Sequence, residues 1–267
     1  MCAVQPYRSI GDMKIWLKQN IKLRSSSDTK YPYIRSCLIS PTKEIVFADE
    51  HNKSLIVYSK DGVFTRDICL SGRPFDLETI YSDRIVVSYG IGKYVEIINL
   101  QDGKVDKRMK LNGFCSGISY LNGRLFVLVN GIGIQEIDLV KNTMTTLEAN
   151  VGKAFLLTTT ENRIYYTDLE TNTLCCCDMT GMPLWDVTSP LLDCSQSISA
   201  DVFGNVFIAA TQSNQIVAIS SDGQNIRKFL DDKQGIILPA AVYYDKSDKC
   251  LLICNRDSRQ AYMYNLM

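Results

Sequence analysis

The chain has 267 residues, of which 46% are hydrophobic, and its 29 basic side chains balance 29 acidic ones. This length and hydrophobic content can bury one large core, whereas a dominant nucleic-acid footprint needs a basic excess that the chain lacks. No apolar run approaches the roughly 20 residues that cross a bilayer. The first ten residues also lack a basic segment followed by an apolar one, so we expect a cytoplasmic protein without a signal peptide.

Short apolar runs recur along the chain with a period of about 40 residues. The first run of each repeat covers residues 45–48, 85–87, 125–128, 164–166, 206–209 and 251–254. A second run follows about ten residues later, at 55–58, 95–98, 134–137, 174–177, 216–219 and 261–264. Turn residues of the Asp-Gly type, such as Asp61-Gly62 and Asp222-Gly223, follow the second run in most repeats and favour tight hairpins.

Each repeat also has a polar outer segment and, before its first apolar run, an inner one. Four strands in each of six repeats predict an all-β fold, a six-bladed β-propeller with four-stranded blades. We expect one domain over residues 1–267. Its approximate units are 29–71, 72–112, 113–150, 151–193, 194–235 and, for the last blade, 236–267 plus 11–19.

The last repeat ends after its third strand, and the N-terminal segment can supply the missing one. Met13, Ile15 and Leu17 alternate with polar residues and Trp16, which is the period of a strand. We predict that this segment pairs with residues 261–266 and closes the ring, because the backbone groups of the last strand would otherwise lack partners.

The first repeat resembles an NHL repeat, with Asp49 after one strand, Asn52 in the loop and Asp61-Gly62 after the next strand. Asp168 and Asn172 give a second version. The pattern is similar to the C-terminal propellers of TRIM-NHL proteins, the tripartite-motif ubiquitin ligases. The resemblance implies a domain that recognises substrate protein or folded RNA. Nothing in this sequence resembles a RING, B-box or coiled-coil segment, so the resemblance implies either the recognition domain of a longer ubiquitin ligase or a stand-alone relative of such a domain.

Variable loops on one side of the disc are the expected binding site, since the strands are committed to blade packing. These loops join second to third strands, or one blade to the next. They carry a mixture of cations and aromatic residues: Arg35, Lys53, Arg73, Tyr89, Lys93, Phe114, Lys153, Arg256 and Arg259. Such a mixture suits a protein interface and also RNA. We expect a protein partner, with structured RNA as the alternative, and neither DNA nor membrane.

Ten cysteines and a single histidine, His51, leave few options for a metal site. Because Cys175, Cys176 and Cys177 are consecutive in one strand, we expect reduced structural thiols. The alternative function is a metal-dependent hydrolase or lactonase of the six-bladed type, with Asp76, Asp201 and Asn205 as its best ligands.

The turn-like sequence around Asp201 and Asn205 favours a structural role for both residues. Asp49 and Asp168 are also expected to accept backbone N–H groups. Two Gly-Ile-Gly segments, at residues 90–92 and 131–133, lack the following helix that would hold phosphate. We therefore predict a protein without catalytic residues, metal or cofactor.

Overall fold

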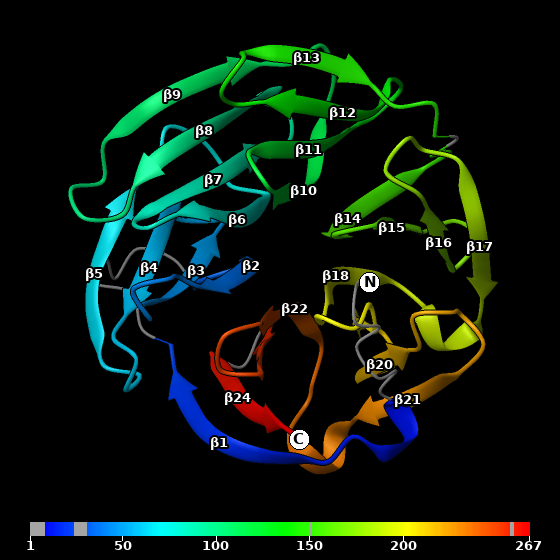
Figure 1. Cartoon of the computed structure of the whole chain (residues 1–267). Helices are drawn as coiled ribbons and strands as arrows, with labels where there is room; N and C mark the ends of the chain where they lie inside the picture. The colour runs from blue at the N-terminus through cyan, green and yellow to red at the C-terminus, as the bar shows by residue number, and fades with distance from the viewer. Residues whose placement is uncertain (1–8, 24–30, 150, 257–258) are drawn as a thin grey trace, which may run out of the picture.

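A computed structural model describes residues 9–23, 31–149, 151–256 and 259–267. Six four-stranded antiparallel sheets are arranged radially around a central axis, as Figure 1 shows. The predicted all-β, six-bladed propeller is therefore confirmed. Within the described residues the helices are three-residue 3-10 turns, η1 (Ile10–Asp12), η2 (Pro190–Leu192) and η3 (Asp232–Gln234), and none has the length or hydropathy of a membrane-spanning helix.

The strands of each blade follow one another from the axis to the rim. Blade 1 consists of β2 (Ile34–Ile39), β3 (Ile45–Asp49), β4 (Ser54–Tyr58) and β5 (Phe64–Cys69). Blade 2 consists of β6 (Asp76–Tyr81), β7 (Arg84–Tyr89), β8 (Tyr94–Asn99) and β9 (Val105–Lys110). Blade 3 consists of β10 (Cys115–Leu121), β11 (Arg124–Val129), β12 (Gly133–Asp138) and β13 (Thr143–Thr146).

The remaining three blades repeat this order. Blade 4 consists of β14 (Ala154–Thr160), β15 (Arg163–Asp168), β16 (Thr173–Cys177) and β17 (Pro183–Thr188). Blade 5 consists of β18 (Ser195–Ala200), β19 (Val206–Ala210), β20 (Gln215–Ile219) and β21 (Ile226–Leu230). Blade 6 consists of β22 (Pro239–Asp245), β23 (Cys250–Asn255), β24 (Gln260–Leu266) and, from the other end of the chain, β1 (Ile15–Lys22).

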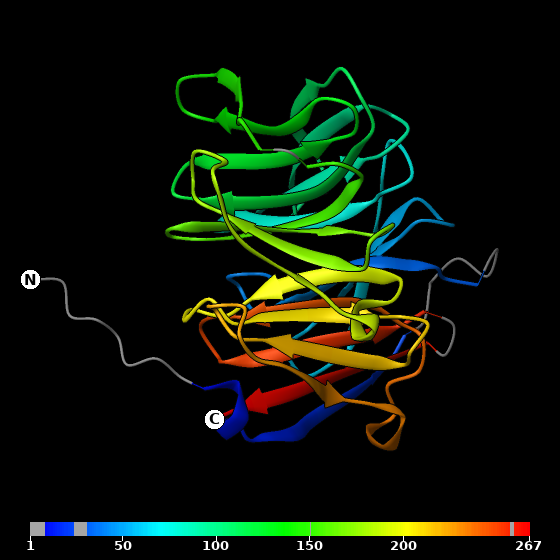
Figure 2. The ribbon, with the colours of Figure 1, turned by 90° about the vertical axis from the view of Figure 1, so that its right-hand side faces the viewer.

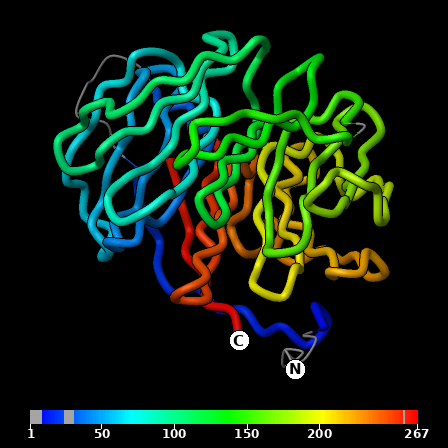
Figure 3. The backbone as a smooth tube through the Cα atoms, turned by 45° about the horizontal axis from the view of Figure 1, so that its top comes forward, coloured from blue at the N-terminus to red at the C-terminus, as the bar shows by residue number. Residues whose placement is uncertain are grey.

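Strand β1 closes the ring, as predicted. It pairs antiparallel with β24 from Ile15 opposite Leu266 to Lys22 opposite Gln260. Figure 3 shows the N-terminal strand lying beside the C-terminal one. A bulge between Leu17 and Gln19 shifts the side chains that follow it. As a result Ile21 is buried between blades 6 and 1, and Leu17 is exposed.

The core lies between the faces of adjacent blades. The middle strands β3, β4, β19 and β20 are buried along their full length, because both of their faces pack against neighbouring blades. Outer strands such as β9 and β17 alternate exposed and half-buried residues. The described cysteines are free thiols, and Cys176 and Cys177 are buried among apolar side chains.

Inner strands are joined by side chains that bond to the next blade. The Ser36 hydroxyl accepts the Leu77 N–H at 3.3 Å, and Ser119 accepts the Thr159 N–H at 3.1 Å. Between blades 5 and 6, Ser199 accepts the Tyr244 N–H at 2.9 Å. The inner edge of each blade faces the channel, where no further strand can pair with it. The polar side chains of the inner strands therefore bond to backbone groups that would otherwise lack partners.

The disc has two faces, which Figure 2 shows edge-on. We call top face the one formed by the loops that join second to third strands and by those that join successive blades. The bottom face carries the loops that join first to second and third to fourth strands. Inner strands run from the top face to the bottom face.

Candidate functional site

The predicted binding residues lie in top-face loops or at their edges. Lys53, Arg73, Lys93 and Lys153 are exposed, whereas Arg35, Phe114, Arg256 and Arg259 are half-buried. Tyr89 is a correction, because it ends β7 with its side chain 1% exposed. It stacks on Tyr94 with ring centres 4.5 Å apart. Tyr89 lies next to a loop in the sequence, so the sequence predicts that its side chain is exposed. As the last residue of the strand, however, it points into the core.

Two arginines of the loop between β23 and β24 stack on tyrosines that precede blade 1. The guanidinium carbon of Arg259 lies 4.1 Å from the centre of the Tyr31 ring, and that of Arg256 lies 5.5 Å from the Tyr33 ring. His51 lies 5.0 Å from Tyr33, ring centre to ring centre. Tyr31 is exposed. Arginine over an aromatic ring is attracted to the ring's negative face, so this cluster has a defined shape at the junction of blades 6 and 1.

The two Gly-Ile-Gly segments form neighbouring loop tips on the top face, at blades 2 and 3. Ile91 is 86% exposed and Ile132 is 37% exposed. Gly90 is needed because a Cβ there would lie 2.6 Å from the Phe114 ring, and the Gly90 carbonyl accepts the Cys115 N–H. At blade 2 Gly90 thus lets the loop pack against Phe114, whereas at blade 3 Gly131 (φ 78°) and Gly133 (φ 125°) adopt positive φ values that favour glycine. The isoleucine of each loop faces solvent. In the sequence these segments resemble only fragments of phosphate loops, and nothing in the pattern indicates that the two isoleucines are exposed.

Charge is unevenly distributed over the top face. Over blades 1 and 2, the exposed Lys53, Arg73 and Lys93 have no ion pair with any described residue. Over blades 3 to 5, Lys153 is already paired with Glu170. The acidic residues Glu148, Glu170, Asp193 and Asp232 gather on that second half. The chain is neutral overall, but its top face has a cationic half over blades 1 and 2 and an acidic half over blades 3 to 5.

Side chains meet across the axis at the top face. Arg35 of blade 1 donates to Gln196 of blade 5 at 3.2 Å, forms an ion pair with Glu50 and lies over the Phe75 ring. Phe75 of blade 2 contacts Phe155 of blade 4 with ring centres 4.9 Å apart, and Phe114 packs against both. Contacts between non-adjacent blades must pass over the channel. Arg35 and Phe114 thus cover the axis.

The residues considered for a hydrolase are engaged in structural bonds. Asp201 accepts the N–H groups of Phe203 and Asn205, both at 2.8 Å, as a turn requires. Asp49 accepts three backbone N–H groups, and Asp168 accepts those of Glu170 and Thr171, which confirms their structural roles. Among the described residues no group of three or more His, Cys, Asp or Glu side chains is placed to hold a metal.

Asp76 belongs to the inner-strand bonds. Its carboxylate accepts the N–H groups of Ile118 and Leu77, each at 2.9 Å, and the hydroxyl of Ser36 at 2.7 Å. Burial raises the pKa of Asp76, while these bonds and the charge of Arg35 oppose that shift. Its lone pairs are directed at neighbouring blades, which leaves it a poor ligand for a cation.

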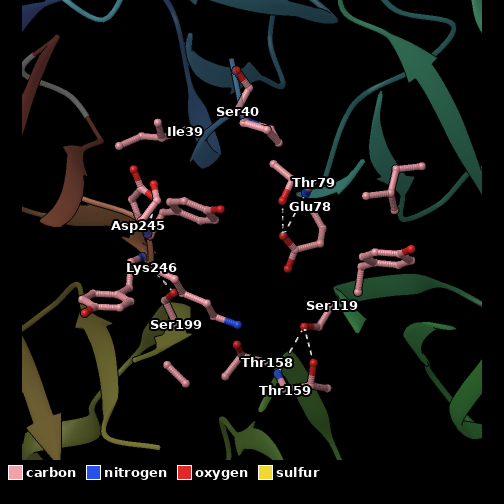
Figure 4. A pocket seen from close by; sticks show the side chains of 17 residues that line it. Ile39, Ser40, Glu78, Thr79, Ser119, Thr158, Thr159, Ser199, Asp245 and Lys246 are labelled. Atoms are coloured by element: carbon pink, nitrogen blue, oxygen red, sulfur yellow. Dashed lines mark hydrogen bonds between the residues drawn. The ribbon is translucent and has the colours of Figure 1, made fainter. Parts of the chain in front are cut away.

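The channel opens on the bottom face, where it widens into a cavity of about 310 Å³. Figure 4 shows this cavity along its opening, with side chains of several blades converging on it. Glu78, Thr79, Ser119, Thr158, Ser199 and Lys246 are among the lining residues. The sequence interpretation missed Glu78, because a strand position facing the axis has no local signature.

No protein-family model matches the chain. The chain is similar to the E3 ubiquitin-protein ligase TRIM56 of Mus musculus, with 23% identity over 230 residues. The match covers 81% of this chain and 31% of the relative, so the chain spans about a third of that protein's length. The resemblance to tripartite-motif proteins that the repeats indicate is thus also found by direct comparison.

Solved structures share the fold at low identity. A protein of unknown function from Bacteroides thetaiotaomicron has a TM-score of 0.72 and 10% identity, over 96% of this chain and 76% of that one. A virginiamycin B lyase from Staphylococcus aureus has a TM-score of 0.67 and 14% identity, over 96% of this chain and all of that one. At such identities the likeness shows the propeller fold alone.

Proposed function

We propose that this propeller is a non-catalytic recognition module that binds a protein partner through its top face. The observation that carries the proposal is the pair of exposed isoleucines, Ile91 and Ile132, each between two glycines, on the face that also carries the unpaired cations. A partner that covers these side chains removes their apolar surface from water, which stabilises the complex. Lys93 lies in the same loop as Ile91, and Lys53 and Arg73 lie in top-face loops of blade 1 and of the junction between blades 1 and 2. These cations would meet acidic groups of the partner.

Protein is favoured over RNA by the character of this surface. A phosphate backbone is attracted by continuous positive charge, but the acidic half of the top face, with Glu148, Asp193 and Asp232, would repel it. Isoleucine is also a poor platform for stacking bases, which aromatic rings or arginine provide. An acidic protein segment next to an apolar patch suits the cationic half and its isoleucines.

The likeness to a ubiquitin ligase supports a role in choosing substrates. We propose that the partner is a cytoplasmic protein that a catalytic part of the parent protein modifies. The support is the NHL-like repeat with Asp49 and Asn52 and the 23% identity to TRIM56. In this division of labour the propeller supplies affinity and orientation only.

The test compares two double variants in recovery of partners from cell extract. Ile91→Asp/Ile132→Asp places charge on the top-face tips, and Val63→Asp/Val140→Asp does the same at two exposed bottom-face positions. Proteins recovered by the wild type and by the bottom-face variant, but lost at least tenfold with the top-face variant, are the expected result. If both variants keep the melting temperature of the wild type and recover every protein equally, the top face is not the binding surface.

A further inference from the structure

The cavity on the bottom face is built from residues of several blades and lies away from the top-face loops. Its volume is about 310 Å³, the size of a site for a small molecule. A narrower extension of about 30 Å³ continues along the axis past Asp76 and Ser36. Hydroxyl groups of Thr79, Ser119 and Ser199 line the wall, so the wall of the cavity is polar around its circumference.

Most charged and hydroxyl groups at this mouth are bonded to each other. Lys43 holds Asp245 at 2.9 Å and Asp248 at 2.8 Å, and it also contacts Ser247. The hydroxyls of Ser119 and Thr159 are 2.8 Å apart. These groups are satisfied by the protein alone and shape the wall.

Two side chains of opposite charge at this mouth keep capacity for a further hydrogen bond or ion pair. Glu78 receives the Thr79 N–H at 2.8 Å and the Thr79 hydroxyl at 3.3 Å, both on the same oxygen, Oε1. Its other oxygen has no hydrogen-bond donor among the described residues. Lys246 likewise forms no ion pair or hydrogen bond with any part of the chain that the structure describes. Figure 4 shows both side chains directed into the opening, one from blade 2 and one from blade 6, on either side of blade 1.

We propose that this cavity binds a small zwitterion, whose ammonium group pairs with Glu78 and whose carboxylate pairs with Lys246. A ligand that carries both charges gives Glu78 and Lys246 each a partner of opposite charge, and it leaves the net charge of the cavity unchanged. The hydroxyls of Thr158 of blade 4 and Ser199 of blade 5 line the same cavity and would bond to polar atoms of the ligand. This site is independent of the proposed partner surface, because it opens on the other face.

The electrostatics of Glu78 agree with a cationic group as its missing partner. Burial raises the pKa of Glu78 to about 7, an effect that the Asp76 charge increases, whereas the Thr79 N–H and Lys246 oppose it. Tyr243 also lies close to Glu78, and it stays protonated because burial and the charge of Glu78 raise its pKa. A bound ammonium would hold Glu78 ionised, so binding releases a proton and weakens as the pH falls below about 7.

The experiment uses amino acids of increasing length as probes. Glycine, β-alanine, γ-aminobutyrate and 6-aminohexanoate separate the two charges by growing distances, and butylamine and butyrate carry one charge each. Isothermal titration calorimetry with the purified chain, at neutral pH, is expected to show binding of at least one zwitterion at millimolar or lower concentration. Butylamine and butyrate are expected to bind at least tenfold more weakly.

Variants locate the site and separate it from the top face. Glu78→Gln and Lys246→Met are each expected to weaken binding at least tenfold. Glu161→Gln and Lys249→Met, exposed on the same face outside the cavity, are expected to change nothing. Ile91→Asp/Ile132→Asp is expected to keep full zwitterion binding, whatever its effect on partner recovery. The proposal is overturned if no zwitterion binds, if butylamine binds as well as the best zwitterion, or if both cavity variants bind like the wild type.

Discussion

The Oδ2 atom of Asp76 accepts the backbone N–H of Ile118 at 2.9 Å, so a side chain of blade 2 satisfies a backbone group of blade 3. Ser36, Ser119 and Ser199 make equivalent bonds from blades 1, 3 and 5 to the blade that follows each of them. The inner edge of a propeller blade has no strand to pair with. Polar residues at this register therefore hold adjacent blades together and fix the width of the channel that the cavity occupies.

Removing the Asp76 carboxylate is expected to destabilise the fold. Asp76→Ala leaves the Ile118 N–H and the Ser36 hydroxyl without their acceptor, which costs about 1–3 kcal/mol. Asp61→Ala, at an exposed turn, serves as the control with little effect. Urea unfolding followed by fluorescence measures both. Equal stability of the two variants would show that Asp76 has no role in joining the blades.

Ring closure by β1 predicts a contrast between two residues of that strand. Ile21 is 1% exposed, so Ile21→Ala should lower the free energy of unfolding by about 2–5 kcal/mol. Leu17 is 52% exposed on the other side of the bulge, and Leu17→Ala should cost less than about 0.5 kcal/mol. Thermal unfolding of the two variants gives the comparison. A larger loss for Leu17→Ala would mean that β1 pairs in another register.

The fold was accessible from sequence because propeller repeats are local signals. Apolar runs 40 residues apart and Asp-Gly turns predict blades, and the alternation from Met13 to Leu17 predicted the closing strand. The bulge after Leu17 was not predicted, since one extra residue in a strand leaves no mark on composition. Because of this bulge, Ile21 is the buried residue of the strand and Leu17 is exposed.

Stability should depend on pH through Glu78. Its pKa in the folded state, about 7, lies above its usual value of 4.5, so the folded protein binds more protons than the unfolded chain between these values. Stability from this group is therefore fully present below pH 4.5 and is lost as the pH rises to 7, by up to about 3 kcal/mol. The stability of the wild type relative to Glu78→Gln should fall over this range. A difference that is constant with pH would contradict the environment described for Glu78.

RNA binding is expected to be weak and barely dependent on salt. If three or more of the cations Lys53, Arg73, Lys93 and Arg256 neutralised phosphates, the logarithm of affinity would fall with that of salt concentration with a slope of about −3 or steeper. A structured RNA hairpin titrated at two salt concentrations measures this slope. Tight binding with a steep slope, lost in Arg73→Glu/Lys93→Glu, would make RNA the ligand of the top face.

The site was less predictable than the fold, for reasons that concern orientation. Tyr89 and Ile91 are two residues apart, yet the first is buried and the second is exposed, because the strand ends between them. Glu78 and Lys246 come from blades 2 and 6, far apart in the sequence, and both line the cavity on the axis. Sequence periodicity places residues in strands and loops, but it does not say which loop tip is held outward or which side chains converge.

Photo-crosslinking from defined positions tests most directly whether the top face is the recognition surface. A photoreactive phenylalanine analogue is placed at position 91 or 132, and for comparison at position 63 or 140, which are exposed on the bottom face. We predict that positions 91 and 132 crosslink to the same cellular protein and that positions 63 and 140 do not. Crosslinks to that protein from positions 63 and 140, with none from 91 or 132, would contradict the account.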